Sequence, residues 1–360
     1  MSHRNHLRAR LLSGATLSLA LAASLFSGGV ARASDPLPGD AIAPPVNINI
    51  ALYYNQIETA GEIGAVHGSS DSHNTRIAAD IQVARFVHTF NLGGTEAGFQ
   101  AFVPYVSFLG QQSAGVANIP APATGLPPFG PGHASLSTAD GFGQPNFGAF
   151  LFPVNNAATG TYAVIGPWIS PPVSGYNKSA NLNPGNNVWT YEMEAGFRKI
   201  LFGTPTTHNL AIEVWGEAYL FGANNNAAAN SPEVFANNIP PIYSLFGVHN
   251  PLAAASSTPA RFNEQPSEEF RVYLPYQIYP ATGGTITPGF YQSFGGKQTY
   301  TLRNGAKIDS GNRTDESQFR LTASTFLSPT WAVMLVGEYD IANHGGPLQR
   351  NVELRLATFF

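Results

Sequence analysis

The alternation of apolar and polar side chains is most regular between Asn187 and Leu220, where two runs flank a short turn at 201–207. In the first run two groups of residues alternate along the chain. The mainly apolar group is Trp189, Tyr191, Met193, Ala195 and Phe197, and the mainly polar group is Thr190, Glu192, Glu194, Gly196 and Arg198. A period of two places successive side chains on opposite faces of a strand, whereas a helix would scatter both groups around its circumference. The pattern predicts a β-hairpin with one apolar and one charged face, and the apolar face meets either a protein core or lipid.

The same period occurs along most of the chain. About twelve segments are strand candidates, near 46–55, 76–89, 98–109, 142–152, 161–169, 187–199, 208–221, 266–279, 284–293, 316–327, 330–340 and 349–360. Three of them are interrupted by Pro104, Pro167 and Pro288, and proline cannot donate to a strand ladder. The candidate at 76–89 loses a clean face from Arg85 to His88, where we expect a β-bulge.

The connections between these candidates alternate in length. Those after odd-numbered strands are mostly long, at 56–75, 110–141, 170–186, 222–265 and 294–315, and those after even-numbered strands are short. Transmembrane β-barrels have short periplasmic turns and long extracellular loops. The pattern predicts an all-β fold, an antiparallel transmembrane β-barrel of about 12 strands with both termini in the periplasm. The long loops are either solvated surface loops, or one of them, such as 222–265, enters the lumen as a plug.

The composition agrees with a barrel that faces lipid on alternate residues. Charged residues make up 11% of the chain, against roughly 25% in soluble domains. No apolar run of about 20 residues follows the N-terminus, so a helical membrane protein is excluded. A net charge of -4 gives no indication of the basic surface that nucleic-acid binding requires. The absence of Cys excludes disulfides and thiol chemistry.

The N-terminus has the features of a secretory signal peptide. Arginines at 4, 8 and 10 precede an apolar stretch at 11–26, and Ala31-Arg32-Ala33 offers a cleavage site. We therefore predict a signal peptide at 1–33, an irregular periplasmic leader at 34–45 and the barrel at 46–360. The chain ends on Phe360, which shares a strand face with Val352 and Leu354. This ending resembles the assembly signal of bacterial outer-membrane barrels, although Thr358 departs from the usual pattern.

Charged side chains on the strands are expected to face the lumen, because an Arg or Lys in the hydrocarbon midplane costs about 2–4 kcal/mol. The residues concerned are Glu192, Glu194, Arg198, Glu213, Glu217, Glu269, Arg271, Arg320, Glu338, Glu353 and Arg355. They form either an internal ion-pair network or a lining whose acidic excess disfavours anions. The aromatic residues Trp215, Tyr219 and Tyr273 share this inward face. They either line a path for an apolar or aromatic solute or fill space in a narrow lumen.

Enzymatic motifs are not found. The sequence has no G-x-S-x-G, H-E-x-x-H, P-loop or G-x-G-x-x-G pattern, and its nine His residues are scattered. Glu192 and Glu194 lie two residues apart on one face and could act as paired carboxylates, but we expect them to pair with Arg198 and Arg271. No catalytic residue, metal site or cofactor is predicted.

Three loop motifs in the middle of the chain resemble a known family. They are GFGQPNFG at 141–148, PPVSGY at 171–176 and LNPGNN at 182–187, followed by the EAGF strand. This order resembles the MetA-pathway phenol-degradation family, although Gln144 stands where that family often has an acidic residue. The resemblance implies a bacterial outer-membrane barrel that passes hydrophobic compounds and is often encoded with aromatic-degradation genes. It supplies no functional residues to carry over.

The primary prediction is an outer-membrane channel for the passive uptake of small hydrophobic or aromatic compounds. One alternative is a structural or adhesive barrel with a closed lumen and partner-binding loops. A barrel-embedded hydrolase is a further alternative. The expected partners are membrane lipid, the barrel-assembly machinery and a small-molecule solute, without nucleic acid.

Overall fold

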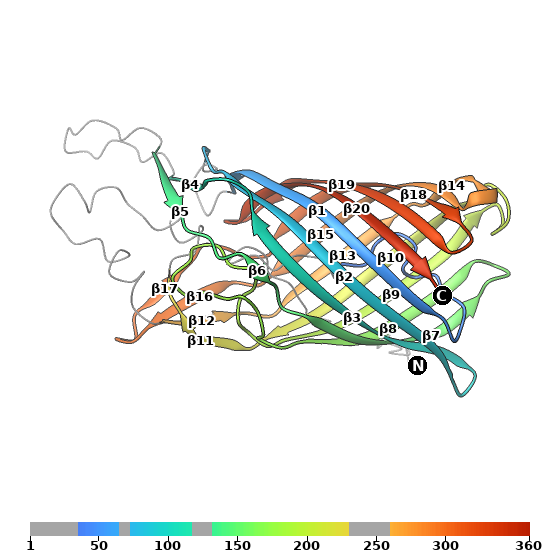
Figure 1. The fold of residues 1–360 in the computed structure, drawn as a ribbon, viewed down its shortest axis with the longest axis horizontal. Helices are drawn as coiled ribbons and strands as arrows, with labels where there is room; N and C mark the ends of the chain where they lie inside the picture. Colours follow the sequence, from blue (N-terminus) through green and yellow to red (C-terminus); the bar gives the residue numbers. More distant parts are fainter. Residues whose placement is uncertain (1–34, 65–72, 117–131, 230–259) are drawn as a thin grey trace, which may run out of the picture.

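A computed structural model describes residues 35–64, 73–116, 132–229 and 260–360. Twelve long antiparallel strands form a closed barrel, with β13 and β14 as two halves of one broken strand (Figure 1). These are β1 (Asn49–Ile63), β2 (Ile77–Leu92), β3 (Thr95–Phe108), β7 (Asn146–Asn156), β8 (Thr161–Ser170), β9 (Thr190–Phe202), β10 (Leu210–Phe221), β13 (Ser267–Tyr273) with β14 (Tyr276–Tyr279), β15 (Gly284–Gly295), β18 (Glu316–Ser328), β19 (Trp331–Asn343) and β20 (Pro347–Phe359). Chain neighbours pair in order and β20 pairs with β1, so no edge is left open. The predicted fold class is confirmed.

The remaining elements belong mostly to the long connections. β4 (Gln112–Val116) pairs with β5 (Gly132–Leu136), and β6 (Gly141–Phe142) pairs with β3. A second small sheet contains β11 (Ala223–Ala227), β12 (Ala260–Glu264), β16 (Gln298–Leu302) and β17 (Lys307–Asp309), and η1 (Pro280–Thr282) is a single 3-10 turn. Figure 1 shows both small sheets at one end of the barrel and the C-terminus toward the other end. Among the described residues, no helix has the length and apolar character needed to cross a membrane.

Two details of the strands differ from the sequence-based expectation. The bulge predicted at Arg85 to His88 is wrong, because the register of β2 runs without a shift against both β1 and β3. The strand is regular, and its pattern is blurred because apolar residues occupy both faces. Pro288 is accommodated within β15, opposite the break between β13 and β14, where its carbonyl accepts from Leu274 N.

Exposure alternates along the strands and separates an outer from an inner face. Tyr191, Met193 and Phe197 on β9, and Trp189 directly before it, are 38–47% exposed, as expected for the outward side of this strand. The intervening Glu192 and Glu194 are buried inside the barrel. On β19, Trp331 and Tyr339 are also about half exposed.

The inner face has two chemically different parts. The strands β1, β2, β3, β7 and β8 present a mainly apolar surface, which we call the apolar wall, with inward residues such as Leu52, Val83, Val87, Phe102, Phe150, Phe152, Val164 and Trp168. The strands β9, β10, β13, β18 and β20 present the charged wall, which contains most of the predicted lumen residues. The hydrophobic cluster of the apolar wall also includes Leu37 and Ala41, from the segment before β1.

Candidate functional site

The segment Asp35–Pro45 lies inside the barrel. The sequence predicts a periplasmic leader here, but its side chains and backbone contact strands from the whole circumference. The segment is irregular, as expected, and folds into a tight turn in which Asp40 N donates to Leu37 O and Ile42 N to Gly39 O, both at 3.0 Å. Leu37 and Ala41 are 3% and 0% exposed. We call residues 35–45 the plug segment.

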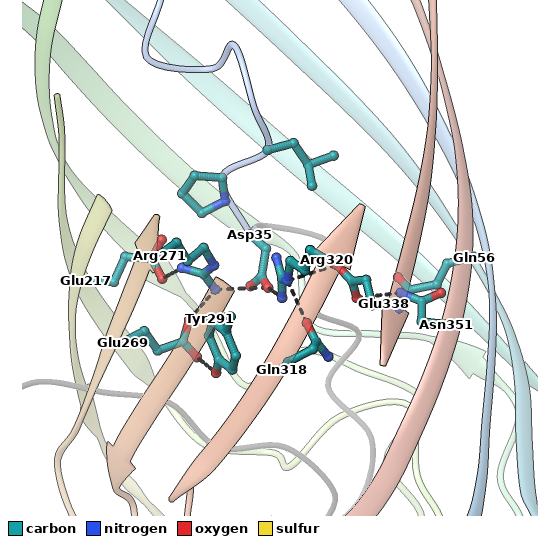
Figure 2. A network of polar contacts seen from close by, with 12 residues as sticks. Asp35, Gln56, Glu217, Glu269, Arg271, Tyr291, Gln318, Arg320, Glu338 and Asn351 are labelled. Carbon is teal, nitrogen blue, oxygen red and sulfur yellow. Dashed lines mark hydrogen bonds and ion pairs between the residues drawn. The ribbon is translucent and has the colours of Figure 1, made fainter. Parts of the chain in front are cut away.

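The first acidic residue of the plug segment completes an ion-pair network. Asp35 Oδ2 lies 2.9 Å from Arg271 Nη2 and 2.9 Å from Arg320 Nη2. Figure 2 shows Asp35 between these two arginines, with Glu217 and Glu269 around Arg271. The network continues from Arg320 to Glu338 at 3.1 Å, so it connects β10, β13, β18 and β19 through the plug segment.

Glu213 holds the middle of the plug segment by its backbone. Its carboxylate accepts from Gly39 N at 3.0 and 3.1 Å and from Ala41 N at 3.4 Å. The same carboxylate accepts from Arg198 Nη1 at 2.8 Å and Trp215 Nε1 at 3.0 Å. Hydrogen bonds to an ionised acceptor are stronger than neutral ones, so this fully buried carboxylate is a firm attachment point.

Asp40 provides a third attachment, to the opposite side of the barrel. Its carboxylate bridges Arg85 on β2 at 3.2 Å and Arg355 on β20 at 2.8 Å. Burial acts to raise the pKa of Asp40, but the positive charges of Arg355 and Arg85 outweigh it and hold that pKa below its ordinary value. Tyr273 adds a hydrogen bond from its hydroxyl to Pro36 O at 2.9 Å.

Two cavities flank the plug segment. One, of about 160 Å³, lies between the segment and the barrel wall, and its apolar lining includes Leu52, Val87, Phe150, Phe152, Val164, Trp168 and Trp215. The polar part of its lining comes from Asp40, Arg85, Gln100, Glu194 and Arg355. An apolar cavity of about 150 Å³ is large enough to bind benzene. The other cavity, of about 350 Å³, is lined by the plug segment together with residues of β15, β18, β19 and β20.

The predicted lumen residues all have buried or half-buried positions. Nine of the eleven charged residues are at most 8% exposed, and Glu338 and Arg355 are half-buried. Trp215, Tyr219 and Tyr273 are buried as well. The ion pairs fit the network interpretation, while a role in selectivity stays a prediction.

The expected pairing of Glu192 and Glu194 with arginines does not occur among the described residues. Arg198 instead binds Glu213, which lies directly opposite it in the β9–β10 register. Arg271 is occupied by Glu217, Glu269 and Asp35.

Sequence reasoning missed Asp35, Asp40 and Arg85 as lumen residues. The available signal was the pair of acidic residues in a leader that has no other charge.

Several predictions concern the ends and loops of the chain. Backbone hydrogen bonds at 2.7 and 2.9 Å join Phe360 to Asn49, and the Phe360 side chain is 66% exposed. Its role as an assembly signal stays a prediction. The signal peptide at 1–33 and most of the loop 222–265 lie outside the described residues.

The strand order and closure define the class of the protein as an outer-membrane-type β-barrel. The crystal structure of the COG4313 outer membrane channel from Pseudomonas putida F1 matches with a TM-score of 0.65 at 21% identity, covering 91% of this chain and 100% of that chain. The transport unit of the autotransporter AIDA-I from Escherichia coli gives a TM-score of 0.45 at 8% identity, covering 91% and 93%. The KdgM porin in complex with disordered oligogalacturonate gives 0.39 at 7% identity, covering 86% and 99%.

A sequence comparison adds a match to a family model over part of the chain. The model of the family described as "Putative MetA-pathway of phenol degradation" matches residues 60–214, a range that includes the three loop motifs. Together with the barrel fold, this match confirms the resemblance to that family of outer-membrane barrels. None of the curated proteins matches the chain.

Proposed function

We propose that this protein is an outer-membrane channel for the passive uptake of small hydrophobic or aromatic solutes. The observation that carries the proposal is the cavity of about 160 Å³ between the plug segment and the apolar wall, which has the size and lining for a single aromatic ring. The Pseudomonas putida protein of similar fold is named an outer membrane channel, which supports the same class of function. In this proposal the signal peptide directs export, and the assembly machinery inserts the barrel into the outer membrane.

The two walls would act on solutes in different ways. The apolar wall stabilises a ring by removing its surface from water. The eleven predicted lumen residues comprise seven Glu and four Arg, so the charged wall carries a net charge of -3 when all are ionised and disfavours anions. A neutral phenol-like solute would therefore pass more easily than a benzoate-like anion. The plug segment forms one side of the cavity of about 160 Å³. It must shift before a solute can leave this cavity and cross the barrel.

Planar-bilayer conductance in the presence of phenol tests the proposed path. We expect phenol to occupy the cavity and reduce the wild-type conductance in a saturable manner. Val164→Trp fills the cavity and should abolish this response. The matched control is Ile165→Trp, because Ile165 is the neighbouring residue on the outward face, at 44% exposure, and this variant should respond like the wild type. An equal phenol response in all three proteins, or none in the wild type, would contradict the proposal.

The plug segment also favours a second function. A lumen occupied by a segment with three attachment points fits a closed structural or adhesive barrel whose long loops bind a partner. The two functions predict different conductances for a variant whose plug segment is released. A barrel that stays electrically silent after Asp35 and Asp40 are both replaced by Asn would favour the closed barrel.

A further inference from the structure

We propose that Glu192, Glu194 and Glu217 bind a divalent cation, Ca²⁺ in preference to Mg²⁺, on the charged wall. Glu194 and Glu217 are direct partners in the β9–β10 register, and Glu192 lies two residues from Glu194 on the same inward face. One carboxylate oxygen from each residue lies within 4.8 Å of the other two. The three residues are only 4–6% exposed, so water screens their mutual repulsion poorly.

Two oxygens of this group have no hydrogen-bond partner among the described residues. They are Glu192 Oε1 and Glu217 Oε1, and both belong to residues that are more than nine-tenths buried. Buried carboxylate oxygens are normally satisfied by donors, and unpaired ones are costly. The lack of a donor at these two oxygens indicates a ligand that carries positive charge.

The surrounding arginines supply only part of that charge. Arg271 reaches Glu217 through one oxygen and also binds Glu269 and Asp35, so a single guanidinium serves three carboxylates. Figure 2 shows this crowding around Arg271, with Glu217 at its edge. Within the described residues, no ion pair involves Glu192 or Glu194.

The donor set and its burial select the kind of cation. Three carboxylates are hard oxygen ligands, which suit Ca²⁺ and Mg²⁺ rather than metals that prefer sulfur or imidazole. Mg²⁺ gives up its waters reluctantly and usually keeps several of them, whereas Ca²⁺ accepts many protein oxygens in a flexible geometry. Three carboxylates that are only 4–6% exposed therefore suit Ca²⁺ better. The bound ion would replace the missing counter-charge and would link β9 to β10 through their side chains.

Terbium luminescence on the complete mature protein in lipid vesicles tests this site. Tb³⁺ replaces Ca²⁺ at oxygen sites, and Trp168, which lies opposite Glu192 in the β8–β9 register, is a suitable energy donor. We expect one saturable Tb³⁺ site, displaced by Ca²⁺ at a concentration at least ten-fold lower than by Mg²⁺. Glu192→Gln and Glu217→Gln should each weaken Tb³⁺ binding at least ten-fold.

Glu353→Gln is the matched control, since Glu353 is another buried lumen carboxylate with an unpartnered Oε1, on β20. It should bind Tb³⁺ like the wild type. Heat-modifiable gel mobility checks that each variant is folded, and a rise in the wild-type melting temperature with Ca²⁺ gives a second readout that needs no variant. The proposal is overturned if the wild type shows no saturable site and no Ca²⁺-dependent stabilisation. It is equally overturned if the folded variants at 192 and 217 bind as tightly as the control.

Discussion

The two walls of this lumen hold the same plug segment by different physical means. On β2, inward residues such as Val83 and Val87 pack in one cluster with Leu37 and Ala41. On the other side, Arg271, Arg320 and Glu213 bind the plug segment through charge-assisted contacts. Apolar contacts are non-directional and tolerate small shifts, whereas ion pairs require particular positions of the partners. The charged wall, together with Arg85 of β2, thus fixes where the plug segment lies, and the apolar contacts let it adjust.

The largest expected effect comes from breaking the charged wall at its centre. Arg271→Ala would leave Glu217, Glu269 and Asp35 without this shared guanidinium, and removal of one partner from a buried ion pair costs about 3–5 kcal/mol. The free energy of unfolding, measured by urea titration in lipid vesicles, should fall by about that amount. Arg350→Ala is the control, since Arg350 is exposed and lies over Tyr339 on the outer surface. Equal losses in both variants would show that the network adds nothing to stability.

A second, intermediate effect should follow from releasing the plug segment without touching either wall. The double variant Asp35→Asn and Asp40→Asn removes the negative charges that pair with Arg271, Arg320, Arg85 and Arg355. The segment then keeps mainly its apolar contacts and the backbone bonds to Glu213, and it should leave its position more often. Single-channel recording should show at least a ten-fold rise in mean conductance or open time. Asp80→Asn serves as the control, because Asp80 bonds Asn55 and Gln82 outside the plug contacts. If the wild type conducts and the folded double variant conducts equally, charge does not hold the segment.

The smallest effect is expected on the apolar wall. Ile81→Val removes one methylene from a side chain that is 2% exposed, and such changes cost about 0.5–1.5 kcal/mol. The outward Ile57, at 40% exposure, gives the comparison Ile57→Val, whose cost should be smaller because lipid fills the space. Unfolding measurements on both variants compare packing inside the lumen with packing against lipid. A larger loss for Ile57→Val would refute the assignment of Ile81 to a closely packed interior.

The sequence predicts the barrel well where the two faces of a strand differ in chemistry. On β9 the contrast between Tyr191 and Glu192 gives both the strand and its orientation. On β2 the method fails, because inward Val83 and outward Phe86 are both apolar and no alternation marks the faces. This explains why the charged wall was predicted and the apolar wall was not.

The location of the plug segment inside the barrel could not be predicted for a different reason. Its Pro, Gly and Ala residues indicate an irregular segment but carry no information about location. Its partners are also remote in sequence, since Asp35 pairs with Arg320 and Asp40 with Arg355. Contacts over such separations arise from barrel closure and leave no local pattern.

The hydrogen bonds of Thr89 determine how far the plug segment can travel. Its hydroxyl donates to Pro45 O at 2.7 Å and accepts from Ile48 N at 3.1 Å. These bonds fix the C-terminal end of the plug segment on β2. The eleven residues of the plug segment itself, fully extended, span about 36–40 Å, somewhat more than the thickness of a bilayer core. A displaced segment is therefore a tethered ligand whose local concentration at its own binding site stays high. Return to the lumen is an intramolecular step whose rate does not depend on how much protein the membrane contains.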